Sequence, residues 1–129
     1  MVAHLIVCEN TDWMPRARIM LSDNTTKTLD RIDMKAHFEM AKSNSLETLL
    51  NEFKTLRESS ILELKNFNLQ NADYTKSAFH PQICEVNLQQ LIATWVTHDL
   101  SHITQIARVL AKQYKDEVGA FAAYLKILK

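Results

Sequence analysis

Glycine, proline and cysteine are scarce in this chain. Its 129 residues include one Gly, two Pro and two Cys. A β-sandwich or barrel needs turn residues at short, regular intervals, and Rossmann and P-loop sites need glycines where phosphate meets the backbone. The near-absence of glycine therefore excludes these folds and these nucleotide sites. It favours an all-α protein with a single domain over residues 1–129.

An excess of charge and long apolar runs are also lacking. Lys+Arg and Asp+Glu are 15 each, so the net charge is zero, and we expect no nucleic-acid partner. The sequence contains no run of eighteen apolar residues, so we expect no transmembrane helix. The first residues, MVAHLIVCEN, lack the basic region of a signal peptide. We therefore expect no membrane partner, a cytoplasmic location, and reduced thiols at Cys8 and Cys84.

Helical periodicity is what the sequence does contain. Apolar residues recur every three or four positions in three segments, which predicts long helices over 87–114 and 45–67 and a third over 2–21 that Pro15 interrupts. Asn87 with Gln90 predicts a capping box at the start of the longest helix, and Gly119 predicts its end.

The remaining segments have weaker patterns. A second capping pair, Asn44 with Glu47, precedes the 45–67 helix. We expect a short helix near 34–42 within an otherwise irregular 22–44 segment. We also expect an irregular crossover over 68–86, and a final short helix or strap over 121–128.

Histidines on the longest helix are the first candidates for chemistry. His98 and His102 lie four residues apart on the apolar stripe, so both imidazoles face the interior. Buried imidazoles need partners, and a shared divalent metal ion provides one. The alternative is a pair of core histidines bonded to backbone or carboxylate groups. If a neighbouring antiparallel helix brings His4 to this pair, three histidines leave one coordination position vacant, as in catalytic sites.

A zinc peptidase is disfavoured by the same segment. HDLSH has the spacing of HExxH, but Asp99 is one methylene shorter than the required Glu, and no His follows His102. We expect Asp99 either to support the ligands from behind or to cap a neighbouring group. His37 and His80 lie in expected loops, with solvated or capping roles.

Three further residues near this candidate site have two interpretations each. We favour Cys8 as a bystander beside His4, and the alternative is a fourth metal ligand. We favour Glu9 as an exposed acid, and the alternative is a base near metal-bound water. Arg57 is favoured as a surface or ion-paired residue, and the alternative is an anchor for an anionic ligand. No residue is identified as catalytic from its type or spacing.

The chain resembles the DinB-like superfamily of helical metalloproteins. The matching stretches are HLIVCENTDWMPR (4–16), LLNEFKTLR (49–57), HPQICEVNLQQLIATWVTHDLSHITQIARVLAKQY (80–114) and VGAFAAYLKIL (118–128). The resemblance implies a four-helix bundle of the up-down-down-up type. It also implies one divalent metal ion, zinc or nickel by preference, held by His4, His98 and His102.

The resemblance further implies an activity class. The family includes thiol-dependent transferases and isomerases, and many of its members have no assigned reaction. For this chain we expect a thiol-dependent transferase or a hydrolase that acts on a small-molecule substrate, with a low-molecular-weight thiol as the candidate cosubstrate. The family's first helix, which would precede His4, has no counterpart in this sequence. It is either missing or supplied by a partner, which predicts a homodimer that covers an open apolar groove. The alternative function is a non-enzymatic helical protein that binds a small molecule or dimerises, with a degenerate metal site.

Overall fold

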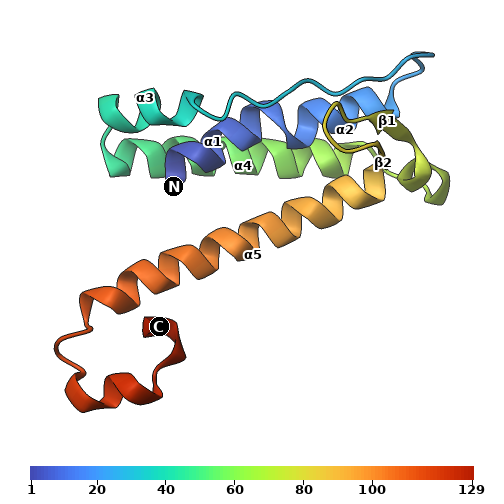
Figure 1. Ribbon diagram of the computed structural model, residues 1–129. Coiled ribbons are helices and arrows are strands. Elements are labelled where there is room, and N and C mark those ends of the chain that lie inside the picture. The colour runs from blue at the N-terminus through green and yellow to red at the C-terminus, as the bar shows by residue number, and fades with distance from the viewer. The chain divides into compact units, whose positions relative to one another are not determined.

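The computed structural model describes residues 1–129, which form two compact units, Met1–Ala93 and Thr94–Lys129. Five α-helices make up most of the chain, and the boundary between the units falls inside α5 (Leu88–Gln113) (Figure 1). The all-α expectation is confirmed in this broad sense, with the addition of a two-stranded sheet. The four-helix bundle and the single domain remain predictions.

The first unit is built around α1 (Val2–Thr11). It packs against α2 (Trp13–Leu21), α3 (Ala36–Ser43) and α4 (Leu46–Asn66). Because its apolar residues surround the helix axis rather than forming one stripe, α1 is buried on nearly all sides. The core cluster and its half-buried neighbours are Ala3, Ile6, Leu49, Val2, Met40, Phe53 and Leu56.

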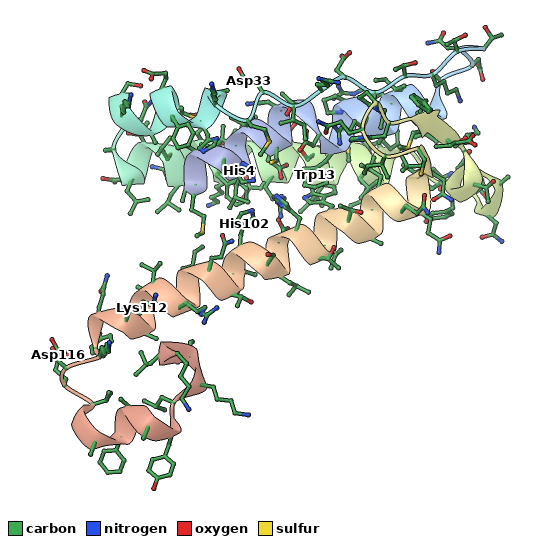
Figure 2. The ribbon with its side chains drawn as sticks, in the orientation of Figure 1. His4, Trp13, Asp33, His102, Lys112 and Asp116 are labelled. Carbon is green, nitrogen blue, oxygen red and sulfur yellow. The ribbon has the colours of Figure 1, made fainter.

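The expected interruption of the N-terminal helix is confirmed, and it occurs at Asp12. The Asp12 N–H donates to the Cys8 carbonyl at 2.9 Å and closes α1, while α2 begins at Trp13. Pro15 lies in the first turn of α2, where a backbone N–H would have no helical partner and its absence costs little. Trp13 is buried at this junction (Figure 2).

Two ion pairs connect α4 to the helices that pack on it. Arg57 donates to Glu9 Oε1 of α1 from Nε at 2.9 Å and contacts it from Nη2 at 2.7 Å, and the Glu9 side chain is only 1% exposed. Arg18 of α2 donates from Nε and Nη2 to the two carboxylate oxygens of Glu63, but its side chain is 56% exposed. The first pair is therefore buried and the second lies at the surface.

The segment over 68–86 is more regular than we expected. It contains a 3₁₀ turn, η1 (Asn71–Thr75), and an antiparallel hairpin of β1 (Ser77–Phe79) and β2 (Glu85–Asn87). The chain near Thr28 pairs in parallel with Phe79, whose N–H donates to the Lys27 carbonyl at 2.8 Å. The prediction of an irregular crossover was wrong here, because strands of three residues are too short to show an alternating pattern.

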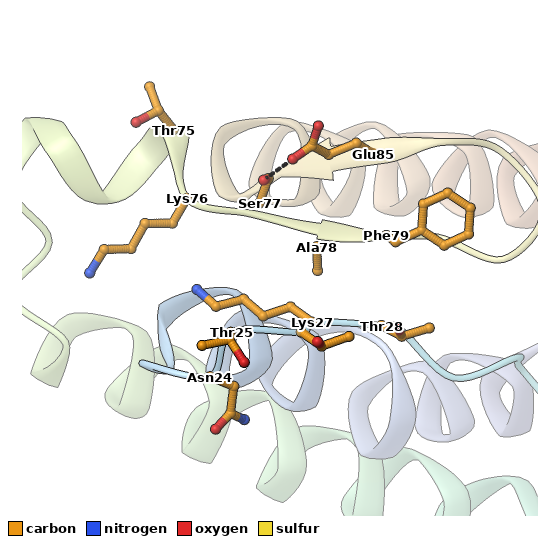
Figure 3. Close-up of a pocket in the computed structure, with 11 residues that line it drawn as sticks. Asn24, Thr25, Lys27, Thr28, Thr75, Lys76, Ser77, Ala78, Phe79 and Glu85 are labelled. Atoms are coloured by element: carbon orange, nitrogen blue, oxygen red, sulfur yellow. Dashed lines mark hydrogen bonds between the residues drawn. The ribbon is translucent and has the colours of Figure 1, made fainter.

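A polar cavity of about 810 Å³ lies between this hairpin and the 24–28 segment (Figure 3). Ser77 and Glu85 of its wall are hydrogen-bonded to each other at 2.5 Å. None of the candidate metal ligands lines it. The cavity is therefore separate from the chemistry that the histidines suggest.

The beginnings of the two long helices test the predicted caps. At α5, the Asn87 N–H donates to Gln90 Oε1 and the Gln90 N–H donates to Asn87 Oδ1, both at 2.9 Å, so the predicted capping box is confirmed. At α4 the predicted Asn44–Glu47 pair was wrong. Ser45 caps this helix instead, with its hydroxyl accepting from the Thr48 N–H.

The second unit continues α5 from Thr94 and ends in short 3₁₀ turns. The helix stops at Gln113, before the predicted Gly119, which adopts a positive φ of 52° at the start of η2 (Gly119–Tyr124). After η3 (Lys126–Leu128), the Lys129 carbonyl accepts a hydrogen bond from Arg108 at 2.6 Å and ties the tail to α5. No helix in the chain combines the length and the apolar character that crossing a membrane requires.

The difference between the two ion pairs gives a stability prediction. Replacement of Arg57 with Met leaves the buried Glu9 carboxylate without its cation, so we expect a loss of about 3–5 kcal/mol in the free energy of unfolding. Arg18→Met, the matched control at the exposed pair, should cost about 0–1 kcal/mol. Urea denaturation measures both values.

A third variant isolates the cause of that loss. Adding Glu9→Gln to Arg57→Met removes the uncompensated charge, so the double variant should recover part of the stability. Equal losses for Arg57→Met and Arg18→Met would contradict the account, as would a double variant less stable than Arg57→Met alone.

Candidate metal centre

The first pair of candidate ligands lies on α1. His4 and Cys8 are one helical turn apart, and Cys8 Sγ lies 3.6 Å from His4 Nε2 and 4.0 Å from Nδ1. Zinc binds sulfur at about 2.3 Å and nitrogen at 2.0–2.1 Å, so a tetrahedral ion places two such ligand atoms about 3.6 Å apart. The α1 pair therefore has the spacing of two ligands of one tetrahedral ion.

His37 lies beside the α1 pair, which the sequence did not suggest. It belongs to α3 rather than to a loop, and its ring packs edge-on against the His4 ring with 5.5 Å between the centroids. The short helix expected near 34–42 is thus confirmed, whereas the expected placement of His37 in a loop was wrong. His37 restricts where the half-buried His4 ring can turn, so it contributes to the position of the candidate ligand.

The Cys8 thiol is held in its protonated form in the metal-free chain. Burial, with further contributions from the neighbouring carboxylates of Asp12 and Glu9, raises the pKa of Cys8 to about 12. A bound metal ion would remove the proton, because a coordinating thiol is deprotonated outright. Without metal, Cys8 is a buried neutral group rather than a nucleophile.

The second pair of candidate ligands lies on α5. His98 Nε2 and His102 Nε2 are 3.1 Å apart, and the rings are inclined at 72° with their centroids 4.4 Å apart. Two nitrogens bound to one tetrahedral zinc ion would lie about 3.3 Å apart. The α5 pair thus presents two Nε2 atoms at the spacing of a shared metal ion, and their role as ligands stays a prediction.

Gln105 selects the tautomer of a neutral His102 ring. Its side-chain Oε1 lies 2.8 Å from His102 Nδ1, and an amide oxygen can only accept, so Nδ1 carries the hydrogen. The Nε2 atom of a neutral His102 then carries the lone pair that a metal ion needs. This is the usual arrangement behind a metal-binding histidine. Sequence reasoning missed Gln105, although its position three residues after His102 indicates that the two side chains are neighbours.

The polar neighbours of the α1 pair differ from their expected roles. Glu9 was expected to be an exposed acid, and this was wrong, because its side chain is buried between α1 and α4. Arg57 is ion-paired, as we expected. The pair uses Glu9 Oε1, and Oε2 is buried without a hydrogen-bond partner. The supporting role of Asp99 remains a prediction.

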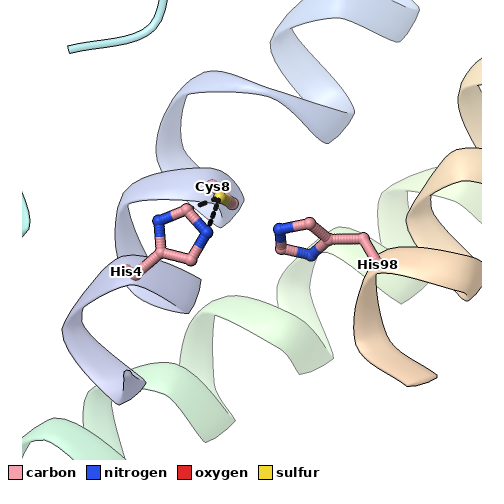
Figure 4. A group of neighbouring side chains, drawn as sticks. All are labelled: His4, Cys8 and His98. Atoms are coloured by element: carbon pink, nitrogen blue, oxygen red, sulfur yellow. Dashed lines mark hydrogen bonds between the residues drawn. The ribbon is translucent and has the colours of Figure 1, made fainter. Parts of the chain in front are cut away.

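The donor atoms of this chain suit a particular class of metal ion. Three of these donors, His4 and Cys8 on α1 and His98 on α5, each offer one atom of a kind that metal ions bind (Figure 4). Imidazole nitrogen and thiolate sulfur suit zinc and other borderline or soft divalent ions better than magnesium or calcium. The predicted set of His4, His98 and His102 shares two of its three members with this group.

Comparison with known proteins gives no family for this chain. Neither the protein-family models nor the curated proteins contain a match. The DinB-like resemblance accordingly remains a prediction from the sequence.

The difference in environment between the two cysteines predicts their reactivity. At pH 8 a thiol with a pKa near 12 is ionised to only about 1 part in 10⁴, so metal-free Cys8 should resist iodoacetamide, while the exposed Cys84 should react readily. Because the thiolate is the nucleophile, the Cys8 rate should rise about tenfold per pH unit up to pH 10.

Mass spectrometry of timed samples, with Cys84→Ser as the control, measures the two rates separately. Equally rapid labelling of Cys8 and Cys84 at pH 8, in protein that circular dichroism shows to be folded, would contradict the burial of Cys8.

Proposed function

We propose that this chain binds one divalent metal ion, zinc or nickel by preference, through His4, His98 and His102. The observation that carries the proposal is the α5 pair, where two Nε2 atoms lie at the ligand spacing of a single ion and Gln105 holds His102 in a metal-binding tautomer. His4 supplies the third imidazole from α1, where its half-buried ring packs against His37. The family resemblance supports the choice of His4.

The proposed chemistry is Lewis-acid catalysis on a small-molecule substrate in the cytoplasm. Three protein ligands leave a fourth position open, and a metal ion there polarises a substrate or lowers the pKa of a bound water or thiol. The resemblance ranks a thiol-dependent transferase slightly above a hydrolase. The chain's own residues hold the ion and orient its ligands: His37 packs on His4, and Gln105 bonds to His102.

A closed, structural site is the second candidate, and a specific distance favours it. Cys8 Sγ lies 3.6 Å from His4 Nε2, the spacing expected if both atoms bind one zinc ion. A fourth protein ligand would fill the open position and end catalysis at the metal. The chain would then be a non-enzymatic helical protein that the ion stabilises.

Metal analysis of purified variants tests the proposed ligands. We expect about one zinc or nickel ion per wild-type chain and a loss of nearly all of it in His98→Ala, because a ligand on the α5 pair is removed. His80→Ala is the matched control, since His80 Nδ1 accepts a hydrogen bond from the Gln82 N–H in the hairpin loop. Wild-type protein that stays metal-free after reconstitution, or His98→Ala that retains its metal, would contradict the proposal.

The same analysis on Cys8→Ser separates an open site from a closed one. The catalytic proposal predicts that this variant keeps its metal, because three histidines remain. A loss as complete as in His98→Ala would assign Cys8 as a ligand and favour the structural role. Circular dichroism of each variant confirms that the helices are intact.

A further inference from the structure

The polar cavity beside the hairpin lies wholly within the first unit. Its lining residues come from the 24–28 segment, the end of η1 and the hairpin. Its volume of about 810 Å³ falls in the range of small-molecule sites, roughly 300–1,000 Å³. Most such sites are apolar, whereas Ala78 and Phe79 are the only apolar residues in the lining of this one. A ligand that fits this cavity must therefore be polar itself.

The backbone of Ser77 faces the cavity with both of its polar groups unpaired. The Lys76 carbonyl accepts from the Leu88 N–H at 2.9 Å, which sets the alternation of the antiparallel ladder between β1 and β2. By this alternation the N–H and C=O of Ser77 and Phe79 point to the other edge of β1. Phe79 is bonded at that edge, where its N–H donates to the Lys27 carbonyl at 2.8 Å. Ser77 has no such partner, so it keeps one donor and one acceptor for a ligand.

Two lysines bring positive charge to the cavity. Lys27 donates from Nζ to the Met20 carbonyl at 2.7 Å, and Lys76 Nζ contacts Asp73 Oδ1 at 2.9 Å. An ammonium group has three N–H donors, so each lysine is held by one contact and keeps two donors for a ligand. In Figure 3 both ammonium groups point towards the end of the cavity that lies away from Phe79.

The other polar side chains of the lining suit the hydroxyl groups of a ligand. Glu85 is the only acid among them, and it accepts a hydrogen bond from the Ser77 hydroxyl at 2.5 Å. Two lysines and one glutamate leave the cavity with an excess of positive charge. The exposed side chains of Asn24, Thr25 and Thr26 make no hydrogen bonds within the chain. Amide and hydroxyl groups both donate and accept, as the hydroxyl groups of a sugar do.

We propose that this cavity binds a small phosphate monoester that also carries hydroxyl groups, such as a phosphorylated sugar. The ammonium groups of Lys27 and Lys76 and the Ser77 N–H hold the phosphate, because lysine and backbone N–H groups form strong hydrogen bonds with oxyanions. The Ser77 carbonyl and the side chains of the 24–26 segment bond to the hydroxyl groups. None of the candidate metal ligands lines the cavity, so this inference does not rest on the proposed metal site.

Isothermal titration calorimetry of the full chain tests the proposed ligand. EDTA in the buffer excludes coordination of the phosphate to a bound metal ion. Glucose 6-phosphate should bind with a dissociation constant below about 1 mM, and glucose, which lacks the charge, should bind about tenfold or more weakly. Equal binding of glucose and glucose 6-phosphate would overturn the proposal. Tighter binding of gluconate, which carries a carboxylate in place of the phosphate, would overturn it too.

Two lysine variants locate the site. Lys27→Met and Lys76→Met should each raise the dissociation constant of glucose 6-phosphate about tenfold or more, because each removes charged hydrogen bonds to the phosphate. Lys54→Met is the matched control, since it removes the same charge from an exposed position of α4 outside the cavity, and it should bind as the wild type does. Unchanged affinity in both cavity variants would overturn the proposal.

Nuclear magnetic resonance of the isotope-labelled wild-type chain tests the site without any substitution, so it is independent of misfolding. Addition of glucose 6-phosphate should shift the backbone amide signal of Ser77, because its N–H bonds to the phosphate, together with signals of the 24–28 segment. The absence of any shift at millimolar glucose 6-phosphate, or shifts confined to residues outside the cavity, would contradict the assignment.

Discussion

The burial of α1 is the constraint on which the first unit depends. A helix of 10 residues is about 15 Å long and is only marginally stable by itself in water. It persists because α2, α3 and α4 cover it on different sides. The Glu9–Arg57 ion pair adds a specific contact to this packing, since a buried carboxylate is tolerated only opposite its cation. Loss of α1 would remove the centre of the unit.

The packing of α1 also fixes the positions of two donor atoms that could bind a metal ion. His4 and Cys8 lie within one turn of α1, so the helix sets the distance between them, and His37 packs against the His4 ring. On α5 the same four-residue spacing brings His98 and His102 together, with Gln105 behind them. Each pair owes its geometry to a helix rather than to a loop, which is how precise binding sites are usually built. The proposed function needs both pairs to act on one ion.

Much of the fold could be predicted from the sequence because its longest helices have strong periodicity. The capping box at Asn87 was predictable because two reciprocal hydrogen bonds require a specific pair of side chains. The hairpin over 77–87 was not predictable, because its strands are too short to show periodicity. Phe79 of the hairpin also pairs with the chain at Thr28, which is far away in the sequence. The buried state of Glu9 was missed because a polar residue on a helix normally marks the solvent side. On a helix covered all round it does not.

The candidate site also has features that could be predicted from the sequence and features that could not. The spacing of His98 and His102 identified the α5 pair, because i and i+4 positions always adjoin on a helix. The contact between His4 and His37 needs the packing of α3 on α1, which no local pattern reveals. The surroundings of Cys8 likewise depend on three-dimensional packing. Sequence reasoning therefore found the donors more readily than the groups that orient them.

X-ray absorption spectroscopy of the zinc-loaded chain tests the central claim most directly, because it counts the ligand atoms around the ion. The account predicts three imidazole nitrogens at about 2.0–2.1 Å around each zinc ion. A sulfur at about 2.3 Å as the fourth ligand would identify Cys8 and a closed site. A shell with only two imidazoles, or one made of oxygen atoms, would contradict the claim that His4 and the α5 pair bind the same ion.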